Sequence, residues 1–301
     1  MSHHLSSLSA RVFIGETFAL GEGPFWFENR LWWVDIDAGT LHSADEAGQN
    51  RTTRHLGRRI GAAAPADSRR FVVALEDGIG LLDRESGGLQ MLAAPESHIP
   101  DNRFNDGKCD PVGRFVAGTL SRSGQRQAAA LYSIDGHGTC RKIFAPVTLS
   151  NGLAWSDDGR TLYHVDSLNR QIAAFDYDLE TGRIANRRIA VEVPENMGLP
   201  DGMDIDDEGN LWVAHWGGWA VRCWSPATGR RLAEIPMPCS APTSCCFGGA
   251  SGSTLFITTA RTEETGAGEL EWAGKIFLCE TSRKGRPPGT FAVQDRADPR
   301  C

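Results

Sequence analysis

The sequence predicts an all-β fold, a six-bladed β-propeller of four-stranded antiparallel blades around a central channel. The main observation is a motif, a polar turn followed by a short apolar and aromatic run, that occurs six times. Its first apolar residues are Leu31, Phe71, Phe115, Leu162, Leu211 and Leu255. Their separations of 40, 44, 47, 49 and 44 residues match the period of about 40–50 residues that is typical of propeller blades. A second observation agrees, because no segment shows sustained helical periodicity.

Each motif is followed, after roughly ten to twenty residues, by a further strand signal, as expected for a blade built as a meander. These signals are apolar alternations that end in polar turns, at residues 39–46, 78–86, 130–138, 171–182, 220–229 and 274–285. The 34 glycines and the Asp-Gly pairs at 77–78, 106–107, 158–159 and 201–202 predict many tight turns between short antiparallel strands.

The two ends of the chain complete the predicted ring. We expect residues 10–18 to add a strand that closes the ring against the last blade, because closure removes two exposed sheet edges. The segment from about residue 283 onward is polar and contains prolines, and we expect a loose tail there. The regular repeat predicts one propeller domain spanning residues 1–301.

Composition restricts the partners and the compartment. A net charge of −7 argues against nucleic-acid binding, which needs a basic surface. No apolar stretch of about 18 residues is present, so no membrane span is expected, and the N-terminus lacks the pattern of a signal peptide. The eight scattered cysteines suit small buried residues in a reducing compartment. We expect a cytoplasmic protein, either a monomer or a weak homo-oligomer.

Four repeats carry an oxygen-bearing residue at one phase, about ten residues before the first apolar residue of the motif. These residues are Glu22, Asn105, Asn151 and Asp201, whereas the matching positions of the other two repeats are Gly61 and Cys245. Equal phase in a propeller means equal height around the axis, so the four side chains should converge at the channel mouth. Any one Asn-Gly or Asp-Gly pair alone would more simply be a turn.

Two carboxylates and two amides in close quarters favour a bound cation, because they would otherwise repel one another or lack partners. Ligands that are all oxygens suit a hard divalent ion such as Ca²⁺, Mg²⁺ or Mn²⁺. The sequence therefore predicts a metal site at the mouth of the channel.

The motifs around these residues resemble the senescence-marker-protein / gluconolactonase / regucalcin family, over roughly residues 15 to 280. They are GEGPFW, RFNDGKCDPVGRFVAGT, SNGLAWSDDGRTLYHVDS and PDGMDIDDEGNLWVAHWGG, in the family's order. The resemblance implies one divalent metal ion, with Ca²⁺, Zn²⁺, Mn²⁺, Mg²⁺ and Fe²⁺ as alternatives. It implies Glu22, Asn151 and Asp201 as metal ligands, and Asp201 also as general base.

The same resemblance implies a metal-dependent hydrolase that opens the ring of a sugar-acid lactone, such as glucono-, xylono- or arabinono-lactone. It places Arg103 and Asn105 at the positions that hold the substrate's hydroxyl and ring oxygens. The chemistry needs no nucleophilic side chain, and Ser150 lies in no GxSxG motif. The main alternative is a calcium-binding regulatory propeller. A scaffold for protein partners and a hydrolase of phosphotriesters or aromatic esters are less favoured.

One loop departs from the family pattern. Family members often carry a glutamate shortly after the GT of the third motif, but the loop Ser121–Gln127 contains no acidic residue. Arg122 or Arg126 could cover the substrate instead, or the loop could simply be exposed. His215 could reach the mouth, although a lone histidine is more often structural. Asp106 and Lys108 flank Asn105, and either could only brace the turn.

Overall fold

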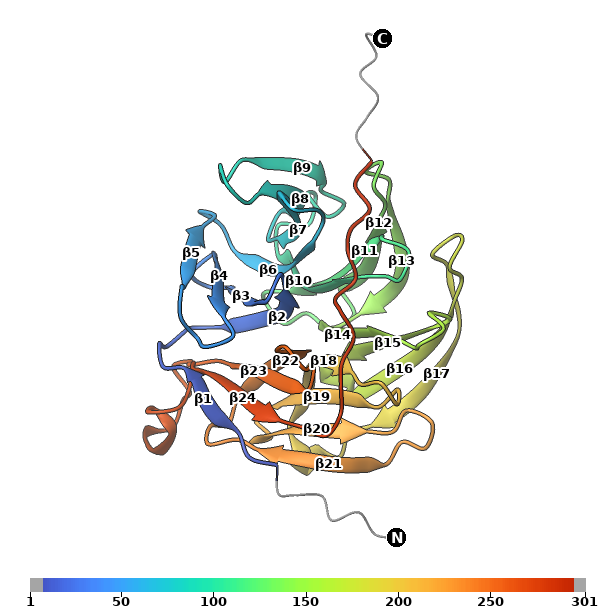
Figure 1. The fold of residues 1–301 in the computed structure, drawn as a ribbon. Helices are drawn as coiled ribbons and strands as arrows, with labels where there is room; N and C mark the ends of the chain where they lie inside the picture. The colour runs from blue at the N-terminus through green and yellow to red at the C-terminus, as the bar shows by residue number, and fades with distance from the viewer. Residues whose placement is uncertain (1–7, 295–301) are drawn as a thin grey trace.

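The computed structural model describes residues 8–294, which form six four-stranded antiparallel sheets arranged as a six-bladed β-propeller (Figure 1). This confirms the predicted fold class. The innermost strands of the blades (β2, β6, β10, β14, β18 and β22) neighbour one another in a closed ring around the axis. Their side chains therefore line the channel.

The blades follow the chain in order. The first three consist of β2 (Gly21–Phe27), β3 (Arg30–Asp35), β4 (Thr40–Asp45) and β5 (Thr52–His55), then β6 (Ile60–Pro65), β7 (Arg70–Leu75), β8 (Gly78–Asp83) and β9 (Leu89–Ala93), then β10 (Asn102–Cys109), β11 (Phe115–Ser121), β12 (Ala129–Ile134) and β13 (Cys140–Val147). The others consist of β14 (Ser150–Trp155), β15 (Thr161–Asp166), β16 (Gln171–Tyr177) and β17 (Ile184–Glu192), then β18 (Leu199–Ile205), β19 (Leu211–Trp216), β20 (Ala220–Trp224) and β21 (Arg231–Pro236), then β22 (Pro242–Gly248), β23 (Thr254–Thr259), β24 (Ile276–Glu280) and β1 (Arg11–Ile14). Three single-turn 3₁₀ helices lie in the connections, η1 (Ser167–Asn169), η2 (Glu195–Met197) and η3 (Ala267–Glu269).

The repeated motif forms the hairpin between the first and second strands of each blade. Its polar turn is held by an aspartate where one is present: Asp110 Oδ1 accepts the backbone N–H groups of Val112 (3.0 Å) and Arg114 (2.7 Å). Asp206 does the same in the fifth blade. The first apolar residue of all six motifs is fully buried, with 0% of its surface exposed. The repeat thus marks where each blade enters the core.

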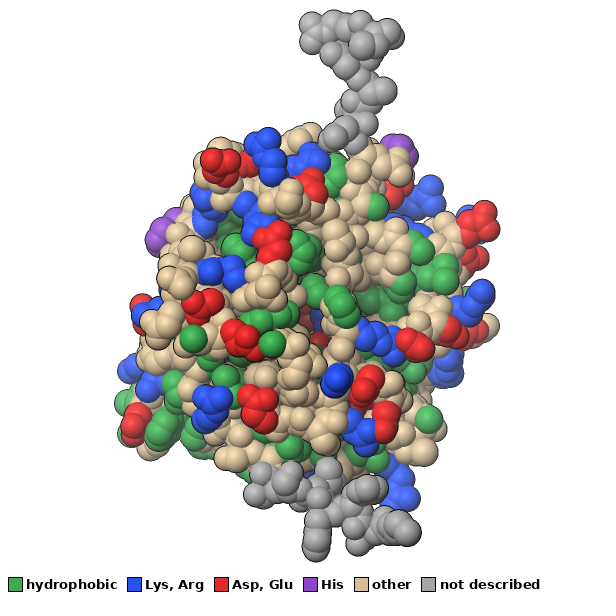
Figure 2. Space-filling model, in the orientation of Figure 1, with side chains coloured by type: hydrophobic (Ala, Val, Ile, Leu, Met, Phe, Trp, Pro, Cys, Tyr) green, Lys and Arg blue, Asp and Glu red, His purple; other side chains and the backbone are tan. Residues whose placement is uncertain are grey.

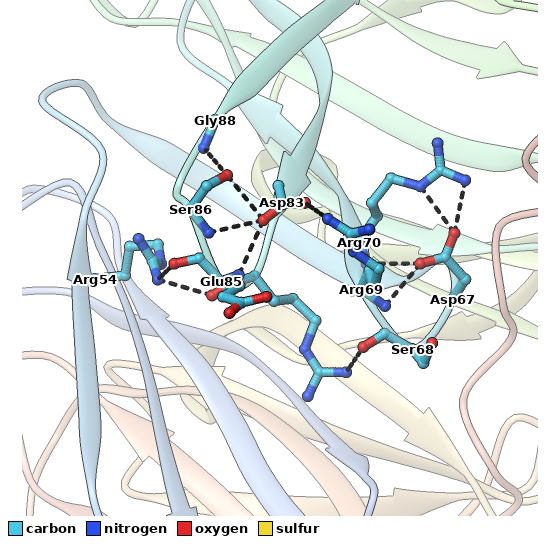
Figure 3. A network of polar contacts seen from close by, with 10 residues as sticks. Arg54, Asp67, Ser68, Arg69, Arg70, Asp83, Glu85, Ser86 and Gly88 are labelled. Atoms are coloured by element: carbon cyan, nitrogen blue, oxygen red, sulfur yellow. Dashed lines mark hydrogen bonds and ion pairs between the residues drawn. The ribbon is translucent and has the colours of Figure 1, made fainter.

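The hydrophobic core lies between neighbouring blades. Between the first two blades, the Phe71 ring packs edge-on against Phe25 and Trp32, with ring centroids 5.6 and 4.8 Å away. Near the outer edge, Arg54 of β5 donates hydrogen bonds to backbone carbonyls of the second blade, including that of Glu85 (Figure 3). Figure 3 also shows Asp83 tying the turn after β8. Neighbouring blades are therefore joined by apolar packing in the core and by hydrogen bonds near their outer edges.

The N-terminal strand closes the ring, as predicted. β1 pairs in antiparallel fashion with β24 and is the outermost strand of the last blade, which otherwise comes from the C-terminal end of the chain (Figure 1). Ile14 is buried in the core cluster that joins this blade to the first blade. Closure therefore combines strand pairing with apolar burial.

The predicted loose tail differs from the structure over residues 283–294, here called the strap. The strap crosses the face at which the inner strands end (Figure 1). Phe291 is 1% exposed within the core cluster of the second and third blades, and its N–H donates to the Pro65 carbonyl (2.7 Å). Gly285 forms a bridge with Asp206 of the fifth blade. One buried phenylalanine in a polar segment is a weak sequence signal, so the strap was not predicted.

The strap helps to form a hollow of about 250 Å³ near the centre of this face, lined by both apolar and charged side chains (Figure 2). Arg286 and Pro287 contribute to its wall, together with aromatic residues of the inner strands. Six of the seven described cysteines are buried, as expected for small buried residues. In residues 8–294, no helix has the length and apolar character that a membrane crossing requires.

Candidate active site

The predicted oxygen-bearing residues all lie at β-bulges in the first half of the inner strands. The pairing of β18 with β19 shifts between Pro200 and Met203, which places Asp201 in the bulge. Asn151 and Asn105 occupy the corresponding bulges of β14 and β10, and Glu22 is the last paired residue before that of β2. A bulge re-aims side chains out of the regular alternation. The shared phase seen in the sequence thus corresponds to a shared backbone feature.

The glycines after these residues serve close approach between inner strands rather than turns. Gly152 and Gly202 lie within β14 and β18. A Cβ atom at Gly202 would lie 2.1 Å from Ser244 Oγ, and one at Gly152 would lie 2.7 Å from the Asp201 carbonyl oxygen. The Asp-Gly pairs at 106–107 and 201–202 are therefore not turns, contrary to the prediction. Only glycine allows the neighbouring strands to pack this closely.

The structure brings five of the six predicted residues into one cavity of about 220 Å³. Its polar lining includes Glu22, Arg103, Asn105, Asn151 and Asp201. All but Arg103 are almost fully buried, with 4–7% of their surface exposed. These side chains come from four different blades, so the ring itself positions them.

A chain of hydrogen bonds orients the amide side chains of this cavity. Arg103 Nη1 donates to Asn105 Oδ1 (2.9 Å), and Asn105 Nδ2 donates to Asn151 Oδ1 (3.0 Å). Asn151 Nδ2 in turn donates to Ser167 Oγ (2.9 Å) in η1. Each amide oxygen has two lone pairs, so Asn151 Oδ1 keeps one lone pair for a further partner. Sequence reasoning did not identify Ser167, because no motif marks it.

Two carboxyl groups line the floor of the site, Glu22 and Asp201, and a third, Asp106, lies buried beside them. Burial and the nearby Asp106 charge raise the pKa of Glu22 to about 8, against the opposing effect of Arg103. Burial, followed by the charges of Glu22 and Asp106, raises the pKa of Asp201 well above its usual range. Asp106 is itself buried, and burial raises its pKa too. Arg103 lowers the pKa of Glu22 and Lys108 lowers that of Asp106, but burial outweighs both effects.

The donor set fits a hard divalent cation. Within the described residues, no three His, Cys, Asp or Glu side chains are placed to hold a metal ion by themselves. The predicted ligands do not form such a group, because only two of them are carboxylates, Glu22 and Asp201, and the third is the amide oxygen of Asn151. Such all-oxygen ligands suit Ca²⁺, Mg²⁺ or Mn²⁺, and a cation would offset the unfavourable burial of the carboxylates.

Asp106 is the charged residue of the site that sequence reasoning underweighted. It follows Asn105 in the same bulge, and its carboxylate acts on both Glu22 and Asp201. Lys108 lies two residues further along β10, where its ammonium group donates to the Met203 carbonyl oxygen (2.8 Å). The sequence signal was present, since Asp106 directly follows a predicted site residue, but its resemblance to a turn obscured it.

Arg122 lies outside this cavity. It lines a neighbouring cavity of about 230 Å³, to which Arg103 also contributes. Its guanidinium donates to the Pro100 carbonyl oxygen. The acid-free loop that contains it is tied to Asp101, which accepts hydrogen bonds from the hydroxyls of Ser121 and Ser123. Arg126 instead donates to Asn169 (3.2 Å). A role of Arg122 in binding substrate stays a prediction.

His215 is fully buried and does not line the cavity. Its Nδ1 atom contacts the Met197 carbonyl oxygen (3.0 Å), and its Nε2 atom accepts the indole N–H of Trp224 (3.2 Å). Ser150 is also fully buried, with its hydroxyl against His164 Nε2 (2.8 Å). Both residues therefore serve the packing of the inner strands, and Ser150 cannot reach a substrate as a nucleophile.

The remaining two blades carry no oxygen ligand at this height. Gly61 occupies the bulge of β6, where a Cβ atom would lie 2.2 Å from the Asn105 carbonyl oxygen. In β22 the bulge residue is Thr243, and its hydroxyl donates to the Gly21 carbonyl oxygen. The predicted match at Cys245 was wrong by two residues, because Cys245 is paired with Ile257 in the regular part of the strand.

The family described as SMP-30/Gluconolactonase/LRE-like region matches residues 20–261, which include every residue of the cavity floor. The chain belongs to this family. Human regucalcin is 36% identical over 298 residues, covering 96% of this chain and 100% of that protein. Among solved structures, the luciferin-regenerating enzyme is 28% identical with a TM-score of 0.89, covering 95% of this chain and all of that one.

A second solved structure, of a protein from Agrobacterium tumefaciens, is described as regucalcin, a calcium-binding protein. It is 28% identical with a TM-score of 0.89, and the match covers 96% of this chain and 98% of that one. The similarity to these relatives thus extends over nearly the whole propeller.

Proposed function

We propose that the protein is a metal-dependent lactonase that hydrolyses a sugar-acid lactone at the mouth of the channel. The observation that carries the proposal is the floor of the 220 Å³ cavity, where buried carboxylates from two blades face oriented amides from two others. Glu22, Asn151 and Asp201 would hold one divalent cation. When bound, such a cation supplies a Lewis acid that polarises the lactone carbonyl.

The side chains of the site divide the remaining tasks. The Arg103 guanidinium and the Asn105 amide lie beside the proposed metal ligands. The guanidinium offers N–H donors to the hydroxyl and ring oxygens of the lactone, and Asn105 Oδ1 offers a lone pair to a substrate hydroxyl, because both N–H groups of Asn105 Nδ2 already donate within the protein. The Asp201 carboxylate accepts a proton from the attacking water, as a general base. Asn105 also orients Asn151 through its Nδ2 atom. Arg122 would contact the substrate only from the neighbouring cavity.

The reaction consumes one water molecule and needs no oxidant or reductant. The water oxygen bonds to the carbonyl carbon, and the bond from that carbon to the ring oxygen breaks. One proton of the water ends on the released ring oxygen as a hydroxyl group. The other leaves with the carboxylic acid, which ionises near neutral pH. The product is the open-chain hydroxy acid.

A panel of lactones tests this proposal. Purified full-length protein is treated with chelator, supplied separately with Ca²⁺, Zn²⁺, Mn²⁺, Mg²⁺ and Fe²⁺, and assayed on glucono-, xylono- and arabinono-lactone above the spontaneous rate. We expect hydrolysis with at least one ion and one lactone, and its loss with chelator. Spontaneous rates throughout the panel would overturn the proposal.

The second candidate is a calcium-binding regulatory protein without a major catalytic role. It is favoured by the names of the relatives, one of which is described as calcium-binding. The same ligand set would serve both functions. Stoichiometric, tight Ca²⁺ binding measured by calorimetry, without turnover of any lactone in the panel, would support this candidate over the first.

A further inference from the structure

The wall of the candidate site is apolar, in contrast to its polar floor. Five half-buried side chains, here called the collar, line the cavity above the proposed metal ligands: Leu20, Leu120, Leu149, Leu199 and Trp216. Because they are only half-buried and line the cavity, part of their apolar surface is available to a bound molecule. Contiguous apolar surface of this kind beside a polar site points to a ligand with an apolar part.

The collar is built by the backbone rather than by chance exposure of single residues. Leu120 at the end of β11 forms a β-bridge with Leu149, directly before β14. Leu199 pairs with Trp216 across β18 and β19. Side chains of directly paired residues project from the same face of a sheet. Leu20 adds a fifth apolar group from the first blade, where it bridges to Ala260.

Few polar groups of the wall are free for additional substrate hydroxyls. The Ser167 hydroxyl already accepts a hydrogen bond from the Asn151 amide, and Asn105 Nδ2 already donates to the Ser150 and Asn151 oxygens. Arg103 Nη1 already donates to Phe104 and Asn105, and the remaining donors of Arg103 serve the lactone ring in the proposed function. A hydroxylated chain that extends upward from the lactone ring would therefore face leucine and tryptophan side chains. Desolvated hydroxyl groups without partners are unfavourable, whereas an alkyl chain gains free energy from the same contacts.

We infer that the site hydrolyses lactones that carry an alkyl chain on the ring carbon next to the ring oxygen, with the chain against the collar. This inference rests on the proposed lactonase function and deepens it by assigning a second substrate class. The chemical step is unchanged: water adds to the carbonyl carbon, the ring C–O bond breaks, and the ring oxygen leaves as a hydroxyl group. The sequence motifs favoured sugars alone because they contain the floor residues and not the whole collar.

A homologous series tests the inference on the metal-loaded full-length protein. The substrates are δ-valerolactone, δ-hexalactone and δ-octalactone, with glucono-δ-lactone as reference. We expect kcat/KM to rise about fourfold for each added methylene, which corresponds to about 0.8 kcal/mol per methylene. A flat or falling series, with glucono-δ-lactone still hydrolysed, would overturn this inference and leave the lactonase intact. Absence of turnover on every lactone would overturn both.

Variants of the collar connect the effect to these residues. Leu149→Thr should lower the ratio of kcat/KM for δ-octalactone to that for glucono-δ-lactone by about tenfold, because it replaces apolar contact by a hydroxyl group. Leu270→Thr is the matched control, since Leu270 is 40% exposed and lies outside the cavity. Leu199→Thr is measured as well, and thermal unfolding shows which variants fold. An unchanged ratio in a folded Leu149 or Leu199 variant would contradict the inference.

Discussion

At the residue scale, the main feature is a group of buried carboxylates whose negative charge a bound cation would compensate. Glu22, Asp106 and Asp201 are all buried and act on one another electrostatically, and each has a raised pKa. This arrangement is unfavourable for the fold without a cation. It becomes favourable when a divalent ion is bound, because the same charges then hold the ligand. The buried carboxylates thus lower the stability of the metal-free protein and favour the binding of a divalent ion.

Asp201→Asn separates these two effects. We expect kcat/KM for the lactone to fall by about 10³-fold or more, because the variant lacks both the general base and a charged ligand. The metal-free variant should be more stable than the metal-free wild type, by about 1–2 kcal/mol in the free energy of unfolding, since a buried carboxyl group near Glu22 and Asp106 is removed. Assays and urea unfolding measure the two changes.

The control for this experiment is Asp157→Asn, a carboxylate that is 90% exposed and forms an ion pair with Arg286 of the strap. We expect wild-type activity in the control. Full activity of Asp201→Asn would remove Asp201 from the mechanism.

Asn105→Ala tests the hydrogen-bond chain. The change removes the donor that contacts both Asn151 Oδ1 and the Ser150 carbonyl oxygen. We expect metal affinity, measured by calorimetry, to fall by about 10–100-fold, because groups that orient a ligand have effects of this size. Asn169→Ala, at an exposed position in η1, is the control. Equal affinity in wild type and Asn105→Ala would show that Asn151 needs no support.

The repeated motif allowed the positions of Glu22, Asn105, Asn151 and Asp201 at one height to be predicted from sequence. Their convergence needed no long-range information, because the ring repeats the same strand six times. Ser167 and most of the collar were missed, and Asp106 was named only as a flanking residue, for a physical reason. Their role depends on which blades become neighbours and on where each bulge turns the chain, and neither is encoded at a fixed spacing.

At the scale of the element, the inner strand with its bulge is the working unit. The bulge presents the ligand, and the glycine that follows lets the next inner strand approach. Gly202 is an example of such close approach, because Ser244 of the next inner strand, β22, lies directly against it. The Asp-Gly pair correctly marked the site in the sequence. The glycine is needed there for close packing of the strands, however, and not for a turn.

Gly202→Ala tests this interpretation. A Cβ atom 2.1 Å from Ser244 Oγ and 2.4 Å from Ser244 Cβ forces the two inner strands apart, which should lower the free energy of unfolding by about 1–3 kcal/mol. Activity should fall as well, since Asp201 would move. Gly15→Ala is the control, because no atom lies within 4 Å of its added Cβ. Equal stability of the two variants would contradict the close approach.

At the scale of the whole molecule, the propeller separates two faces. The candidate site lies toward the starts of the inner strands, and the strap lies across their ends. The repeat predicted the ring and its closure by the N-terminal strand, because both follow from periodicity and from the need to cover sheet edges. It could not predict the strap, which has no repeat and depends on one buried phenylalanine.

The buried histidines make a prediction for the pH dependence of stability. Burial, with a contribution from Arg222, lowers the pKa of His215 to about 3, and burial lowers that of His164 to about 4. Both values lie below the usual 6.5, so the unfolded chain binds more protons than the folded protein between these limits. Each histidine therefore reduces stability as the pH falls below 6.5, by up to about 1.4 kcal/mol per pH unit.

The comparison of wild type with His215→Gln isolates this effect, because the raised carboxyls of the site act in the opposite direction in both proteins. We expect the stability of the wild type relative to the variant to decrease as the pH falls from 6.5 to 5. His137→Gln, at an exposed turn, is the control. A pH-independent difference between wild type and His215→Gln would show that His215 is not held neutral by the fold.

The most direct test of the central claim is a titration of chelator-treated protein with the activating divalent ion, followed by lactone hydrolysis and by calorimetry on the same samples. We predict that hydrolysis above the spontaneous rate appears in proportion to occupancy and saturates at one ion per chain, and that Asp201→Asn shows no such rise. Binding of the ion without any rise in hydrolysis, or hydrolysis that is unchanged by chelator, would contradict a metal-dependent lactonase at this site.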